Sequence, residues 1–117
     1  MKYFTFEEFD SPDEISSGKH MRREFLELLD FAREEAQVPF KITSGFRTES
    51  HNKKVGGVTD SSHLKGCAVD ISCTSSSQRS IIVRALVNVG FTRLGIAKSF
   101  IHVDNDPDKS DAIWLYS

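Results

Sequence analysis

Two histidines and an aspartate stand out as candidate metal ligands. His63 lies in a polar segment, Asp70 follows seven residues later, and His102 lies in the apolar segment Phe100–Val103. Zinc binds well to two imidazoles and one carboxylate, with a fourth position left to water. Such a site polarises a carbonyl group and lowers the pKa of its water. Spacing alone leaves a second interpretation open, in which His102 is a core histidine and the His-x6-Asp spacing carries no chemistry.

Two charged residues near these candidates extend the predicted site. Asp104 follows His102 at an interval of two on a predicted strand, so both side chains share one face. Asp104 would then orient a ligand, carry a proton, or simply be a solvated charge at the strand end. Arg47 follows Ser44-Gly45-Phe46, and a guanidinium binds a carboxylate through two parallel hydrogen bonds. An ordinary surface arginine is the alternative for Arg47.

The elements that must position these residues are predicted from periodicity. Apolar residues at helical spacing predict helices over 20–37 and 78–89, the second capped by the serines at 75–77 and ended by Gly90. Its inward face is expected to carry Ile81, Ile82, Ala85, Leu86 and Val89. A helical turn is expected within 48–54, and strands over 3–6, 40–44, 68–72, 91–96, 100–104 and 113–116. The prediction is a single α+β domain over residues 1–117, with two main helices on a small antiparallel sheet.

Composition excludes several classes of protein. The chain has 117 residues and a formal net charge of -2, without the basic stripe of a nucleic-acid binder. No apolar run approaches the length of a membrane span. The two cysteines, Cys67 and Cys73, flank Asp70 at odd offsets and therefore point to the opposite face of a strand. We expect buried, reduced thiols there, and the alternative is a zinc site with thiolate ligands.

The order of these fragments resembles a known family. Ser44-Gly45-Phe46-Arg47, Asn52, Gly56-Gly57, the segment from Ser61 to Ile71 and finally His102-Val103-Asp104 follow one another as in the zinc D-Ala-D-Ala carboxypeptidase family. This family shares its fold with the hedgehog signalling domain, and its short members are phage and bacterial enzymes that cleave peptidoglycan peptides. The resemblance implies that zinc binds to His63, Asp70 and His102. It also implies that Arg47 holds a substrate carboxylate or carbonyl oxygen, and that Ser61 contacts substrate or braces the site.

One position departs from the pattern of several family members. They carry a catalytic Glu or Asp three residues before the last histidine, where this chain has Ser99. We therefore expect Asp104 to act as the acid/base, together with Arg47 as a catalytic residue. The alternative for Asp104 is a group hydrogen-bonded to a metal ligand.

The resemblance implies a zinc-dependent peptidase that acts on D-amino-acid-containing peptidoglycan peptides as a D-Ala-D-Ala carboxypeptidase does. Two alternatives are an endopeptidase for the L-Ala-D-Glu bond or a cross-bridge, as in phage endolysins, and a non-catalytic zinc-containing wall-binding or virion module. The expected partner is the peptidoglycan peptide, without nucleic acid or membrane, and the expected state is a monomer. The N-terminus lacks an apolar signal stretch. We therefore expect synthesis in the cytoplasm and access to the cell wall through phage- or lysis-mediated release, or as a virion component.

Overall fold

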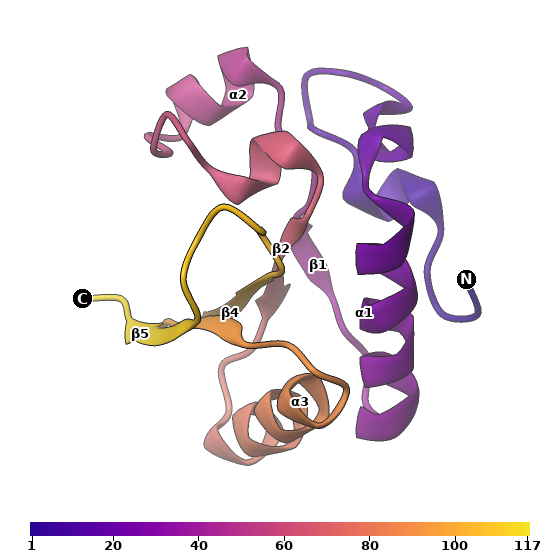
Figure 1. Cartoon of the computed structure of the whole chain (residues 1–117). Helices are drawn as coiled ribbons and strands as arrows, with labels where there is room; N and C mark the ends of the chain where they lie inside the picture. The colour runs from indigo at the N-terminus through magenta and orange to yellow at the C-terminus, as the bar shows by residue number, and fades with distance from the viewer.

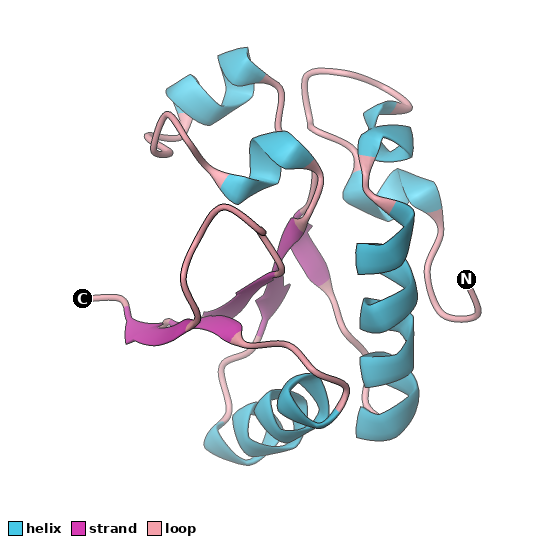
Figure 2. Ribbon diagram, in the orientation of Figure 1, coloured by secondary structure: helices cyan, strands magenta, loops and turns pink.

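A five-stranded mixed sheet with three α-helices forms the molecule in the computed structural model, which describes residues 1–117 (Figures 1 and 2). The strands follow the spatial order β1-β2-β4-β3-β5. Their bounds are β1 Ile42–Ser44, β2 Ala68–Ser72, β3 Arg93–Ile96, β4 Phe100–Asp104 and β5 Ala112–Leu115. The α-helices are α1 Arg23–Ala36, α2 Glu49–Lys54 and α3 Ser76–Asn88, and three 3-10 helices are η1 Phe6–Phe9, η2 Ser17–His20 and η3 Ser62–Lys65. These elements confirm the predicted α+β class.

The two longer helices pack against each other and against one face of the sheet (Figure 1). α1 contributes an apolar stripe that includes Phe25 and Leu29. It ends at Ala36 and is followed by Gln37, whose backbone is left-handed, two residues before Pro39. α3 begins after Ser75, whose hydroxyl accepts a hydrogen bond from the Gln78 backbone N–H as a cap. Ile81 was expected to face inward, but it is 41% exposed. Its position lies just outside the apolar stripe of the helix, so this expectation was wrong.

Strand alternation separates the core from the opposite face of the sheet. In β2 the side chains of Val69 and Ile71 enter the core, and in β4 those of Ile101 and Val103 do the same. The residues between them therefore face away from the helices. The short elements of residues 45–66 lie beyond the end of the sheet at which β1 ends and β2 begins (Figure 1). This end of the sheet is where the predicted site residues are placed.

Two sequence-based expectations about strands differ from the structure. Residues 3–6 do not form a strand: η1 already begins at Phe6, and Phe4 is buried in the core. The sheet is not wholly antiparallel, because β5 pairs in parallel with β3. The other neighbouring pairs are antiparallel as expected. No helix has the length and apolar character that a membrane crossing requires.

Candidate metal centre

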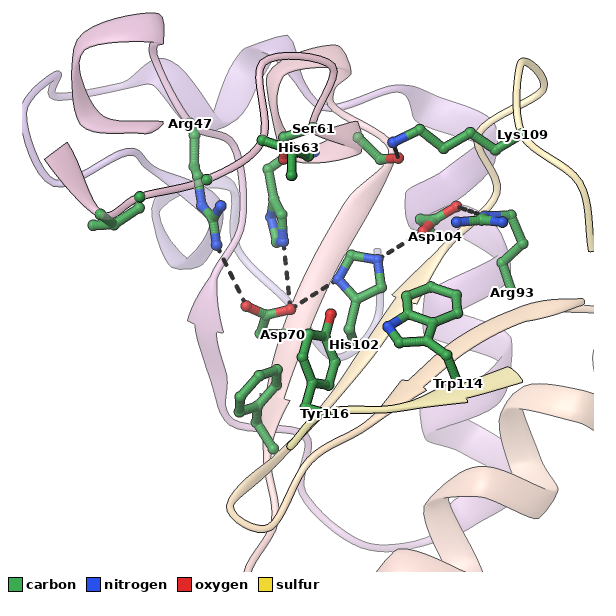
Figure 3. A pocket seen from close by; sticks show the side chains of 16 residues that line it. Arg47, Ser61, His63, Asp70, Arg93, His102, Asp104, Lys109, Trp114 and Tyr116 are labelled. Atoms are coloured by element: carbon green, nitrogen blue, oxygen red, sulfur yellow. Dashed lines mark hydrogen bonds and ion pairs between the residues drawn. The ribbon is translucent and has the colours of Figure 1, made fainter. Parts of the chain in front are cut away.

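The three predicted ligands meet at one point of the structure (Figure 3). Asp70 in β2 and His102 in β4 are direct partners across the antiparallel ladder, so their side chains lie together on the same face. His63 comes from η3, which lies over that face. One ligand atom from each residue can be chosen so that all three lie within 4.8 Å of one another. The fold therefore assembles the donor set that the sequence predicted.

Each imidazole of this group makes a hydrogen bond through the ring nitrogen that does not contact Asp70. The Nδ1–H of His63 donates to the carbonyl oxygen of Gly45 at 2.8 Å. The Nε2–H of His102 donates to Oδ2 of Asp104 at 2.6 Å. Because these oxygens can only accept hydrogen bonds, they fix the ring proton on His63 Nδ1 and on His102 Nε2. The lone pairs of His63 Nε2 and His102 Nδ1 are thereby left facing Asp70.

Three acceptors thus converge on one small space. Oδ1 of Asp70 lies 3.4 Å from His63 Nε2 and 3.0 Å from His102 Nδ1. The two imidazole nitrogens and the carboxylate oxygen are all acceptors when the rings are neutral, so either a proton on a ring nitrogen or a metal ion must lie between them. Two nitrogens and one carboxylate oxygen are a donor set of open zinc sites. The residues present therefore fit a zinc ion with a position left for water.

The electrostatics of the group favour positive charge at the same place. Burial alone would raise the pKa of Asp70, but its hydrogen bonds with His102 and His63 outweigh this and hold the pKa well below its usual range. Burial alone would lower the pKa of His102, but its hydrogen bonds with Asp104 and Asp70 raise it. Both directions show that a positive charge between the Asp70 and Asp104 carboxylates is favoured, and either a proton on His102 or a divalent metal supplies such a charge.

Asp104 lies behind His102, on the side of the ring opposite Asp70 (Figure 3). Its side chain is 1% exposed, and Oδ1 accepts from Nε of Arg93 at 2.8 Å and from the backbone N–H of Asp106 at 3.1 Å. Both oxygens are therefore engaged away from the ligand-facing nitrogen of His102. Of the three roles considered, burial argues against a solvated charge, and the geometry favours orientation of a ligand over the acid/base role that we expected.

Arg47 lies at the rim of the group and points toward Asp70 (Figure 3). Its Nη2 is 3.6 Å from Asp70 Oδ2, while Nε donates to Ser44 Oγ and Nη1 to Asn52 Oδ1 at 3.1 and 3.2 Å. Asn52 in turn donates to the carbonyl oxygen of Val58 at 2.9 Å. The guanidinium is thus held in place by neutral groups with only a long contact to a carboxylate. Asn52 belongs to the motif, but its contact with Arg47 was not predicted.

Ser61 positions the turn that carries the first ligand. Its hydroxyl accepts a hydrogen bond from the His63 backbone N–H at 3.2 Å and so caps η3. The residue is buried beside the cleft that contains the metal group. Of the two roles implied for Ser61, the observed contact is the bracing one.

Comparison with known protein families agrees with this geometry. The family model described as peptidase M15 matches residues 2–104 of the chain. The chain belongs to the peptidase M15 family. M15 peptidases are zinc-dependent, so the protein is a zinc metallopeptidase that hydrolyses peptide bonds, and the resemblance drawn from the motifs is confirmed. No curated protein matches the chain in a sequence search.

The cysteines of this M15 peptidase stay apart from the metal group. Cys67 and Cys73 are both free and buried on the core side of the sheet, as strand alternation predicts. Burial raises the pKa of the Cys67 thiol to about 11. A thiol in that state is a poor metal ligand, because metals bind the thiolate. The interpretation of both residues as reduced core thiols fits this structure.

An aromatic wall, which we did not predict, completes the M15 cleft. It consists of Phe100 in β4 with Trp114 and Tyr116 at β5, and it lines a cleft of about 450 Å³ together with the metal group and Arg47. The Trp114 ring lies 5.5 Å from that of His102, and Arg93 stacks on its other side at 4.9 Å. Alternation places Trp114 and Tyr116 on one strand face, but no local signal shows which strand β5 joins. The parallel pairing of β5 with β3 is what brings both rings to the cleft.

Proposed function

We propose that this peptidase removes the terminal residue from D-Ala-D-Ala-ending peptidoglycan peptides. The motif resemblance supports the substrate class, and one structural observation supports the carboxypeptidase mode. Arg47 lies beside the metal ligands with only a 3.6 Å contact to Asp70, whereas Arg93 is paired with Asp104 at 2.8 Å and Lys109 donates to the Asp60 carbonyl oxygen and the Ser62 hydroxyl. A guanidinium beside the metal ligands is placed to bind the free carboxylate of a substrate whose last peptide bond is cleaved.

Each residue of the site has its own role in hydrolysis. Zinc, when bound, lowers the pKa of its water and polarises the substrate carbonyl. His63 and His102 would hold the ion, and Asp70 would supply the single negative charge among the ligands. Asp104 and the Gly45 carbonyl keep the two imidazoles in the orientation and tautomer that binding needs.

Arg47 orients the peptide in this scheme. Its Nε and Nη1 are held by Ser44 and Asn52, so Nη2 remains directed to the metal group. Because the guanidinium is already fixed, little conformational entropy is lost when it binds an anion. The substrate is thereby placed with its last peptide bond over the three ligands.

The test is incubation of the full chain with defined peptides, with and without a chelator, followed by mass spectrometry. We expect a stem pentapeptide ending in D-Ala-D-Ala to lose one alanine, and a matched peptide ending in L-Ala-L-Ala to remain intact. The chelator should stop the reaction, and zinc should restore it. Cleavage only at an internal L-Ala-D-Glu or cross-bridge bond would favour the endopeptidase alternative and overturn the carboxypeptidase proposal.

Recognition of the terminal carboxylate is tested with Arg47→Gln on free and C-terminally amidated peptides. A charged hydrogen bond contributes about 1.5–3 kcal/mol, so the wild type should prefer the free peptide by roughly 10- to 100-fold in kcat/KM. The variant should lose this preference. Arg84→Gln, which changes an exposed arginine of α3, is the matched control and should keep it. A preference unchanged in Arg47→Gln would show that the carboxylate is bound elsewhere.

A further inference from the structure

β5 lies outside the residues that match the M15 family model, yet it brings two aromatic side chains to the metal group. In the register of the sheet, Gly95 of β3 pairs with His102 on one side and with Trp114 on the other. Tyr116 follows Trp114 at an interval of two and therefore lies on the same face. The Tyr116 backbone N–H donates to the Ile96 carbonyl oxygen at 2.9 Å, which continues the pairing and fixes this residue.

The absence of a side chain at Gly95 makes room for both rings. A Cβ atom at this position would lie 2.6 Å from the Tyr116 ring and 2.7 Å from the Trp114 ring. Real Cβ atoms do not approach ring carbons this closely, since the contact is well inside van der Waals distance. The glycine therefore lets the two rings lie over β3, next to the face that carries His102.

The ring of Tyr116 is packed, while its hydroxyl faces the cleft. The ring centroid lies 5.1 Å from that of Phe100 and 6.3 Å from that of Trp114, and the residue is 43% exposed. Figure 3 shows the hydroxyl directed toward the gap between Asp70 and His102. Arg47 approaches Asp70 from the other side. The Arg47 guanidinium and the Tyr116 hydroxyl therefore flank the metal group within the same cleft.

A phenol at this position can supply one specific kind of catalysis. Its O–H group is protonated at neutral pH, because the ordinary pKa of tyrosine is about 10. A preorganised donor aimed at a carbonyl oxygen stabilises the negative charge that grows there as the bond is attacked. The O–H bond stays intact throughout, so no proton has to be returned.

We propose that Tyr116 is a catalytic residue of this enzyme, whose phenol O–H donates a hydrogen bond to the carbonyl oxygen of the scissile peptide bond. This role rests on the peptide hydrolysis proposed above. Phe100 and Gly95 act through it as positioning residues, since one packs on the ring and the other leaves space for it. The alternative is that Tyr116 serves only as an apolar wall of the cleft.

Tyr116→Phe separates these roles, because it keeps the ring and removes the hydroxyl. Loss of one oxyanion donor lowers kcat by about 100-fold, and the structure predicts an effect of this order with KM changed less than about twofold. Tyr3→Phe is the matched control. It removes the other tyrosine hydroxyl of the chain, which donates to Glu34 at the surface, and should leave kcat unchanged. Wild-type kcat in Tyr116→Phe would overturn the proposal.

A second readout does not depend on turnover. Trp114 is the only tryptophan of the chain and lies in the cleft, so its fluorescence should report the binding of a phosphinate dipeptide analogue to the zinc-loaded protein. The analogue carries the tetrahedral, anionic oxygens of the transition state. We expect Tyr116→Phe to weaken its binding by about 10-fold or more, with zinc content and thermal stability unchanged.

The two readouts distinguish failure of this proposal from failure of the proposed function. A wild type that binds the phosphinate more tightly than Tyr116→Phe does but cleaves no D-Ala-D-Ala peptide would overturn the substrate assignment and support the role of Tyr116. A wild type that cleaves the peptide no faster than the variant would overturn the role of Tyr116 alone. Absence of phosphinate binding by the wild type would overturn both.

Discussion

The two imidazoles of the metal centre are held by acceptors of different charge. His63 donates to a neutral backbone carbonyl, whereas His102 donates to the Asp104 carboxylate, which is itself paired with Arg93. A carboxylate behind a ligating imidazole raises its basicity more than a carbonyl does. The two histidines therefore differ as ligands, because only His102 depends on the negative charge of a side chain behind it, the Asp104 carboxylate.

Replacement of Asp104 by asparagine tests this dependence. The amide oxygen can still accept from His102 Nε2–H, but the negative charge is lost and Arg93 has no acidic partner. We expect zinc affinity to fall by about 10- to 100-fold, as for other outer partners of metal ligands. Competition with a chromophoric chelator measures the affinity, and kcat at saturating zinc measures catalysis.

The matched control is Asp108→Asn, which changes an exposed carboxylate on the next turn of the chain. It should leave zinc affinity unchanged. An Asp104→Asn protein with wild-type zinc affinity and a kcat reduced to background would contradict the orienting role. That result would restore the acid/base role expected from the sequence.

At the residue scale, the sequence predicted the three metal ligands but not the groups that surround them. The order of the motifs identified His63, Asp70 and His102, and an interval of two on a strand placed Asp104 beside His102. The nitrogen that each ring presents depends on partners from distant segments, such as Gly45. Such a partner has no signature in local spacing, and the same holds for the approach of Tyr116.

At the scale of elements, β5 shows why local patterns did not define the sheet. The Asp106-Pro107-Asp108 segment turns the chain back after β4, as expected. However, β2 and β3 already flank β4, so the returning strand can pair only at a free edge. It pairs with β3, which runs antiparallel to β4, and the new pair is therefore parallel. Alternation within β2 and β4 was predictable because it depends on neighbouring residues only.

The loop that leads to β5 is fastened to η3 by Asp106. Its buried carboxylate accepts from Ser62 Oγ at 2.8 Å and from Lys65 Nζ at 2.9 Å. Burial alone would raise the pKa of Asp106, but these hydrogen bonds lower it to about 2. This contact joins the element that carries His63 to the segment that carries the aromatic wall.

The lowered pKa of Asp106 predicts a dependence of stability on acid. A folded-state pKa below the unfolded value of about 3.9 adds stability that is complete above that value and is lost as the pH falls toward 2. Asp106→Asn should therefore lower the free energy of unfolding by about 1–2 kcal/mol at pH 7, and by progressively less between pH 4 and pH 2. Urea unfolding at several pH values measures this difference.

The control for this prediction is Asp60→Asn, which changes an exposed aspartate near the same loop. Its effect on the free energy of unfolding should be small. A constant difference between the wild type and Asp106→Asn from pH 7 to pH 2 would show that the carboxylate contributes no charge-dependent stability to the folded protein.

At the scale of the whole molecule, the sheet has the hydrophobic core on one face and the cleft of the metal group on the other. One face is buried under α1 and α3, and the other carries Asp70, His102 and the aromatic wall, with His63 and Arg47 reaching the same cleft from the segments beyond β1. The three ligands come from η3, β2 and β4, so the site exists only when these elements are assembled. Zinc binding is therefore coupled to folding, and the ion should stabilise the folded chain.

Zinc titration of the metal-free protein by calorimetry tests the central claim most directly. Wild type, His63→Ala and the control His51→Ala, which changes a histidine of α2 outside the group, are compared. We predict one zinc ion per chain for the wild type and the control, and an affinity at least about 100-fold lower for His63→Ala. A His63→Ala protein that binds zinc as tightly as the wild type would contradict the assignment of the metal centre.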